Sequence, residues 1–181
     1  TVQIINKDNR LNDTTKTPQV HRPRPGHADL AGALKWHTND CRNTLERASA
    51  RETAARTAGG AISRCLLRSF GIRVFGYVKG MLDVIAPIAP TLDRLDELIL
   101  SRNNSLVYCP DEISCNAMRA IIKQAKIDKD TVGGFCETIV FGAPPGIGSC
   151  AAWQQKLDAN IAYAVMGIQA FKAVEIGLGI N

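Results

Sequence analysis

The stretch His21–Arg56, HRPRPGHADLAGALKWHTNDCRNTLERASARETAAR, decides the fold of this sequence, because a rigid turn is followed there by helix-like segments. It also contains all three histidines of the chain and seven of its arginines and lysines. Proline fixes its own backbone and glycine permits a tight turn. Pro25-Gly26 therefore predicts a turn that places His27 on a rigid, irregular segment.

His27 lies two residues before Asp29, whose carboxylate is close enough to hold the imidazole in one tautomer. Arg22 and Arg24 lie on the other side of the turn. A histidine beside two arginines suits the transfer of a proton to an anionic leaving group. The simpler alternative is a loop histidine that caps the turn, and these residues alone leave both interpretations open.

The second half of the stretch contains a capping box, with Ser49 as the N-cap of a helix and Glu52 as its reciprocal partner. Arg47 and Arg51 cluster with Ser49 at this helix N-terminus, where unpaired N–H groups and the helix dipole favour an anion. The cluster therefore indicates a phosphate site. Alternatively, the arginines pair only with nearby acids such as Glu46.

The rest of the chain alternates helix and strand patterns. Apolar residues at three- and four-residue steps predict helices over 30–35, 49–70, 92–100, 111–127 and 156–167. Runs of β-branched and aromatic residues predict strands over 2–5, 72–78, 107–109, 131–141 and 171–177. This order favours an α+β fold, with helices packed against mixed or antiparallel sheets, over a doubly wound parallel sheet. A single domain over residues 1–181 is the default at this length.

The helix over 49–70 carries a run of small residues, which predicts a face against which another backbone packs closely: Ala54, Ala55, Ala58, Gly59 and Gly60. Cys65 on its apolar side is predicted to be a core residue. Such a face also suggests self-association into a homo-oligomer.

The charge is uneven: residues 1–73 carry a net charge of +7, whereas the remainder carries −2. A basic first third implies an anionic partner, which could be a phosphorylated metabolite, a cofactor or nucleic acid. Trp36 is the only aromatic residue before Phe70, so the stacking platforms of a nucleic-acid binder are lacking. We therefore expect a small anionic ligand and no nucleic acid.

The six cysteines never form a C-x-x-C pair, so neither a zinc site nor a redox motif is predicted and no metal is expected. Scattered cysteines without framework spacing are typical of a reducing cytoplasm. The longest apolar run, Ile161–Phe171, is too short to span a bilayer. We expect a cytoplasmic protein with no membrane partner.

Several segments together resemble chorismate synthase, the FMN-dependent lyase of the shikimate pathway of aromatic amino acid biosynthesis. RPGHADLAGALK followed by LERASARETAAR carries the resemblance, and INKD, DTVGG, PPGIGS and KLDANIAYAVMGIQAFKAVEIG extend it along nearly the whole chain in family order. The resemblance implies the layered β-α-β sandwich of that family and a homotetramer. It also implies a 1,4-elimination of phosphate from 5-enolpyruvylshikimate 3-phosphate, with reduced FMN, to give chorismate.

The resemblance also implies roles for individual residues. His27 matches the family histidine that protonates the departing phosphate, and Arg24 and Arg51 match positions near the anionic substrate. Flavin-binding positions are matched by Arg47, Ala48, Ser49, Gln169 and Ala170.

The match is to the central portion of such an enzyme, because the family's N-terminal G-E-S-H-G segment and C-terminal K-P-I-P-T-like loop have no counterpart here. Ala173 and Lys129 stand where the family usually has glycine. We expect these 181 residues alone to be inactive. The alternative function is a non-catalytic fragment of the enzyme that retains the core and the oligomer contacts.

Overall fold

The computed structural model describes residues 3–5, 13, 15–48 and 50–179. The chain divides into two compact units, which we call unit 1 (residues 1–63 and 146–181) and unit 2 (residues 64–145). The helix α3 (Ala50–Ser69) ends the first part of unit 1 and begins unit 2. A single domain over 1–181 stays a prediction.

Unit 2 is built on an antiparallel sheet in the order β2-β1-β3, with β1 (Arg73–Met81), β2 (Val84–Ile85) and β3 (Gly134–Phe141). Arg73 pairs with Phe141 at one end of the β1–β3 ladder and Met81 pairs with Gly134 at the other. A register shift between Val78 and Gly80 interrupts this ladder. The predicted strands over 72–78 and 131–141 are confirmed in type.

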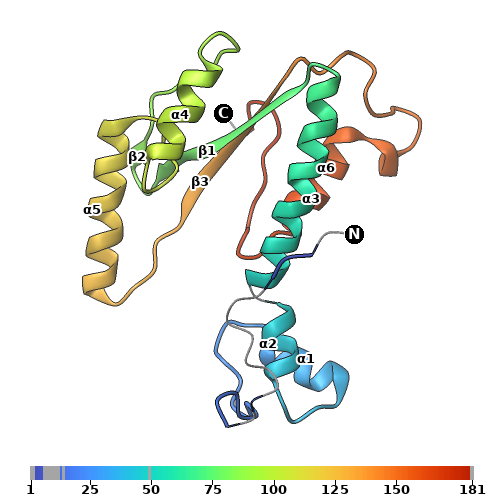
Figure 1. Ribbon diagram of the computed structural model, residues 1–181, viewed down its shortest axis with the longest axis vertical. Helices are drawn as coiled ribbons and strands as arrows, with labels where there is room; N and C mark the ends of the chain where they lie inside the picture. The colour runs from blue at the N-terminus through green and yellow to red at the C-terminus, as the bar shows by residue number, and fades with distance from the viewer. Residues whose placement is uncertain (1–2, 6–12, 14, 49, 180–181) are drawn as a thin grey trace. The chain divides into compact units, whose positions relative to one another are not determined.

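Two helices pack on this sheet, α4 (Leu95–Asn104) beside β1 and α5 (Glu112–Asp128) beside β1 and β2 (Figure 1). Asp111 begins α5 as predicted, because its Oδ2 accepts a hydrogen bond from the Ser114 N–H at 2.7 Å. Apolar side chains between the layers form two buried clusters: Phe75, Tyr77, Leu95 and Leu98, and Ala86, Cys109, Cys115 and Met118. Unit 2 is thus a small α+β layer structure.

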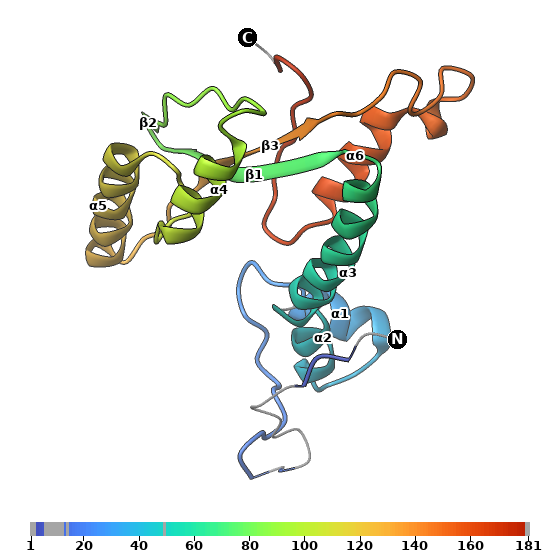
Figure 2. The same ribbon diagram turned by 45° about the horizontal axis from the view of Figure 1, so that its top comes forward.

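Unit 1 is helical in its described residues, with α1 (Asp29–Trp36), α2 (Arg42–Arg47), the first part of α3, the 3₁₀ turn η1 (Trp153–Gln155) and α6 (Leu157–Met166). The two short helices α1 and α2 pack together (Figure 2). Their contact is close, because a Cβ added at Gly32 of α1 would lie 2.3 Å from Cγ2 of Thr44 on α2. α2 was not predicted from the sequence.

Three predicted strands are wrong. Residues 3–5 and 171–176 have no regular structure, and Val2 lies outside the described residues. The segment 107–109 is a turn in which Tyr108 has a φ of 57°, which no extended strand allows. The segment bonds to the sheet through the Tyr108 carbonyl, which accepts a hydrogen bond from the Val78 N–H at 3.0 Å. Strand-like residues form a strand only where a neighbouring strand supplies hydrogen bonds.

One prediction of packing is also wrong for the described part of the chain. Cys65 is exposed. On α3, Gly59 and Gly60 have no described atom within 4 Å of an added Cβ. The face of α3 at Gly59 and Gly60 is therefore open among the described residues. The C-terminal end of α3 does match prediction, because Gly71 takes a φ of 75°.

Candidate functional site

The loop that precedes His27 is tied to the segment between α1 and α2. Asp40 accepts a hydrogen bond from the Val20 N–H at 3.0 Å, and the Cys41 N–H donates to the Val20 carbonyl at 2.8 Å. His21 adds a bond from Nδ1 to the Asn39 carbonyl at 2.8 Å. These bonds hold the backbone leading to the Pro25-Gly26 turn, where Gly26 takes a φ of 66°.

Asp29, the first residue of α1, is fully buried and is the centre of the candidate site. Its Oδ2 accepts from Nε of Arg24 at 2.9 Å and from the Arg24 backbone N–H at 3.1 Å. These hydrogen bonds from Arg24 hold the pKa of Asp29 well below its ordinary range, although burial opposes the shift. Asp29 is therefore an ionised, buried carboxylate.

His27 is oriented by this carboxylate, as its spacing to Asp29 predicts. Nδ1 of His27 lies 2.6 Å from Oδ1 of Asp29. Because an ionised carboxylate can only accept, Nδ1 carries a proton. Nη2 of Arg24 lies 3.0 Å from Nδ1 and 3.1 Å from Nε2. The arrangement holds the imidazole between a carboxylate and a guanidinium.

The other two histidines have structural positions. His21 bonds the Asn39 carbonyl, and His37 ends α1 in a left-handed conformation with a φ of 50°. Of the three histidines, only His27 contacts both a carboxylate and an arginine.

The arginines around the start of α3 are partly paired. Arg51 forms an ion pair with Glu46 of α2, as the simpler interpretation of this cluster predicted. Arg47 is exposed at the end of α2, and Ala48 follows as its C-cap. Ser49, with its predicted capping role, lies outside the described residues. The cluster therefore offers Arg47 as an exposed cation and Arg51 as one already bound to a carboxylate.

Gln169 and Ala170 are brought to α3 by the tertiary structure. The Thr53 hydroxyl donates to Oε1 of Gln169 at 3.1 Å, across 116 residues of sequence. Ala170 has a φ of 69°, which is uncommon for a residue with a Cβ and turns the chain sharply after Gln169. This bond places Gln169 beside Thr53 of α3, four residues after Ser49 in the sequence.

Thr53 and Arg56 support this arrangement and were not predicted. The Arg56 guanidinium lies against Gly167, where an added Cβ would be 3.1 Å from Nη2. Its Nε bonds Glu52 at 3.2 Å. A cation at the C-terminal end of α6 is favourable for the helix dipole. No local sequence signal identifies either residue, because both act on a segment more than a hundred residues away.

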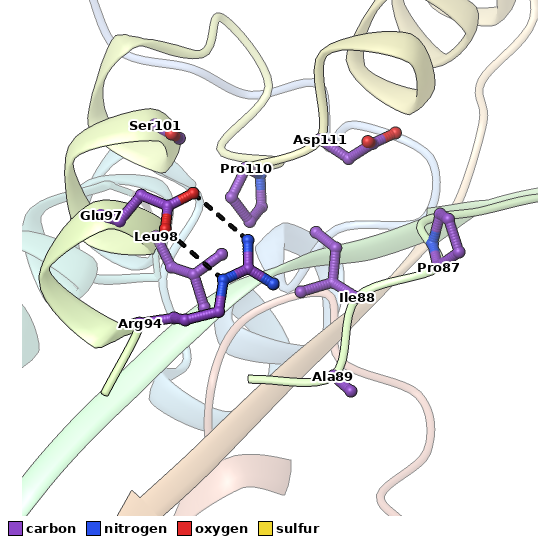
Figure 3. A pocket seen from close by; sticks show the side chains of 9 residues that line it. All are labelled: Pro87, Ile88, Ala89, Arg94, Glu97, Leu98, Ser101, Pro110 and Asp111. Carbon is purple, nitrogen blue, oxygen red and sulfur yellow. Dashed lines mark hydrogen bonds and ion pairs between the residues drawn. The ribbon is translucent and has the colours of Figure 1, made fainter. Parts of the chain in front are cut away.

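Unit 2 contains a separate cavity of about 310 Å³ between α4, the segment 87–89 after β2 and the residues just before α5, shown in Figure 3. Arg94 and Glu97 face each other there, with hydrogen bonds of 3.2 and 3.4 Å. Asp111 on the opposite side is already the N-cap of α5. Since these charged groups are engaged, the cavity offers little charge to a ligand, and it contains no predicted site residue.

Among the described residues, no cluster of three or more His, Cys, Asp or Glu could hold a metal ion. No helix in the described part of the chain is long and apolar enough to cross a membrane.

Comparison with known proteins agrees with the resemblance seen in the sequence. A family model described as chorismate synthase matches residues 1–181. The chain belongs to the chorismate synthase family. Chorismate synthase of Desulforamulus reducens is 49% identical over 162 residues, covering 90% of this chain and 42% of that protein. Chorismate synthase of Brevibacillus brevis is 51% identical over 163 residues, covering 90% of this chain and 42% of that protein.

A solved crystal structure of chorismate synthase has a similar fold, with a TM-score of 0.77 and 36% identity. The structural match covers 84% of this chain and 48% of the solved chain. The predicted α+β fold of the chorismate synthase type is therefore confirmed. The chain spans less than half the length of the relatives it matches.

Proposed function

We propose that the protein containing this chain is a chorismate synthase, which removes phosphate and a proton from 5-enolpyruvylshikimate 3-phosphate by 1,4-elimination to give chorismate. Membership of the family and the oriented His27–Asp29 pair support this proposal. The observation that carries it is the imidazole of His27 held by an ionised, buried carboxylate beside Arg24. A non-catalytic fragment is the weaker alternative, because the family model matches residues 1–181 and relatives are about half identical over 90% of this chain.

In this proposal His27 is the general acid for the departing phosphate. Nε2 carries the proton in the imidazolium form, which the Asp29 carboxylate stabilises through Nδ1, and transfers it to the phosphate oxygen as the C–O bond breaks. A protonated Nε2 can no longer accept from Arg24, so the guanidinium is released toward the anionic substrate. Proton uptake by His27 and anion binding by Arg24 are thereby coupled.

Arg51 is proposed to bind the anionic substrate as well. Its present partner is Glu46, so a substrate phosphate or carboxylate must compete with that carboxylate for the guanidinium. An anion that offers two oxygens can do so through the guanidinium fork.

Reduced FMN is the proposed cofactor, held by Arg47, Ala48, Ser49, Gln169 and Ala170. The polar groups at these positions suit a flavin. Oε1 of Gln169 accepts a hydrogen bond from Thr53, so the amide NH₂ of Gln169 can donate to a ligand. Arg47 is an exposed cation. When bound, reduced FMN supplies an electron and proton shuttle without net oxidation of the substrate. The chain's own contribution is to fix the amide and the turn at Ala170.

We further propose a homotetramer in the cytoplasm, acting without nucleic acid or a membrane. Exposed apolar side chains on α3 support assembly, since such surfaces mark protein interfaces: Ile62, Leu66 and Phe70. A second copy is the partner that the open Gly59-Gly60 face would contact. All six cysteines are free thiols, which fits a reducing compartment.

The test is an anaerobic assay with 5-enolpyruvylshikimate 3-phosphate and reduced FMN, using a full-length chain that contains these 181 residues. Chorismate and inorganic phosphate should form in equal amounts, and neither should form without reduced flavin. Flavin binding without turnover would refute the proposed activity and favour the non-catalytic alternative.

A further inference from the structure

A second cavity in unit 2, of about 190 Å³, is lined by four arginines. Arg64 and Arg68 come from the end of α3, Arg73 from the start of β1 and Arg102 from α4. Arg64 and Arg68 lie four residues apart and therefore on the same side of the helix. Three different elements thus converge with the same charge on one small volume.

Two of these arginines are held in place. Nη2 of Arg73 donates to Oδ1 of Asp96 at 2.5 Å. Arg102 donates to a backbone carbonyl of β1 at 2.7 Å and to Oδ1 of Asn103 at 2.9 Å, and its guanidinium lies 5.2 Å from the Phe75 ring centre. Each guanidinium has five N–H donors, so both retain donors for a ligand. The fixed pair forms a preorganised part of the cavity.

The other two arginines are not held by hydrogen bonds. Neither Arg64 nor Arg68 forms an ion pair or hydrogen bond with the described residues, and the nearby Asp96 is ion-paired with Arg73 while it also feels the charge of Arg68. Burial and the nearby positive charge of Arg64 lower the pKa of Arg102. Four positive charges against one carboxylate repel one another, so the cluster costs folding free energy unless an anion neutralises it.

We propose that this cavity binds a tetrahedral oxyanion, either inorganic phosphate or the phosphate group of a small monoester. A dianion offsets most of the uncompensated charge, and its oxygens match the forked geometry of guanidinium groups. The arginines surround one small cavity instead of forming an extended stripe, and its remaining lining includes the aliphatic Val74 and Ile99, so a nucleic acid is not the favoured ligand.

The inference is independent of the proposed catalytic function. None of the four arginines is among the residues proposed to bind substrate or flavin. A protein that fails in the turnover assay can therefore still bind phosphate here, and the two proposals can fail separately.

The test is a titration of the 181-residue chain with inorganic phosphate, against chloride at the same ionic strength, by isothermal calorimetry. A parallel titration uses glycerol 3-phosphate. Binding of phosphate alone indicates a site for the inorganic ion, and tighter binding of the ester indicates a site for monoesters. Equal responses to phosphate and chloride would overturn the proposal.

Variants locate the site. Arg64→Gln and Arg68→Gln should each weaken phosphate binding roughly tenfold, the value of one or two charge-assisted hydrogen bonds. The control is Arg119→Gln, which removes an exposed arginine of α5 and should leave the affinity unchanged. Equal losses in all three variants would show a general charge effect and overturn the assignment.

The melting temperature gives a second test, because Arg64→Gln should change it in opposite directions without and with phosphate. Without phosphate, Arg64→Gln relieves repulsion and should raise the melting temperature. At saturating phosphate the same change removes a ligand contact and should lower it relative to the unsubstituted chain. A melting temperature that falls in both buffers, with unchanged phosphate affinity, would contradict the proposed site.

Discussion

The Thr53 hydroxyl on α3 donates a hydrogen bond of 3.1 Å to the side-chain carbonyl of Gln169, just beyond α6. This one bond joins the two segments that the family resemblance assigns to flavin binding. It fixes which end of the Gln169 amide is available, because Oε1 is engaged and the NH₂ group is left to donate.

Removing this bond should weaken flavin binding without unfolding the chain. In a full-length chain, Thr53→Val should raise the flavin dissociation constant roughly 3- to 10-fold, the value of one ordinary hydrogen bond. The matched control is Thr57→Val, since Thr57 one turn later bonds only the Thr53 carbonyl. Fluorescence titration of FMN measures both, and equal affinities would mean that Thr53 does not position Gln169.

His27→Ala should lower turnover by about 10²–10⁴-fold, the usual share of a general acid, while flavin affinity stays nearly the same. His37→Asn is the control, because asparagine also tolerates the left-handed conformation that His37 adopts. Anaerobic turnover and flavin titration of the full-length variants test this. Full activity of His27→Ala would remove the catalytic assignment.

Asp29 should make the free energy of unfolding depend on pH. Because its pKa is depressed in the folded chain, its stabilisation is fully present above the unfolded value of about 3.9 and is lost as the pH falls below it. Asp29→Asn should lower the free energy of unfolding at pH 7 by about 1–3 kcal/mol, through lost charge-assisted hydrogen bonds. The difference between the two chains should shrink toward pH 3.

Urea unfolding at both pH values measures that difference. Asp93→Asn, which changes an exposed acid of unit 2, should show no such pH-dependent gap. A gap for Asp29→Asn that is constant with pH would mean that the carboxylate is not specially stabilised in the folded state.

The contact between α1 and α2 should be sensitive to a single methyl group. A Cβ at position 32 would overlap the Thr44 side chain, so Gly32→Ala should destabilise the chain by about 1–3 kcal/mol. The Thr44 hydroxyl is buried without a hydrogen-bond partner among the described residues, so Thr44→Ala should cost little. The double variant should recover most of the loss in thermal unfolding. Additive losses would show that the two residues do not share this space.

Local sequence signals determined the helices other than α2, and the Pro25-Gly26 turn. The cap at Asp111, the left-handed Gly71 and the Pro25-Gly26 turn are decided within a few residues of themselves, so the sequence predicted α5, the end of α3 and the place of His27. The pairing of His27 with Asp29 was also predictable, because only two residues separate them. Motif order then identified the family.

The tertiary structure alone decided which strand-like segments form strands and which partners the site residues take. Residues 171–176 have a strand composition but find no neighbouring strand among the described residues, whereas β1 and β3 find each other. Pairing Thr53 with Gln169 depends on how segments that are distant in sequence pack. Hydrogen bonds and ion pairs between distant segments are set by three-dimensional packing, which no local pattern encodes.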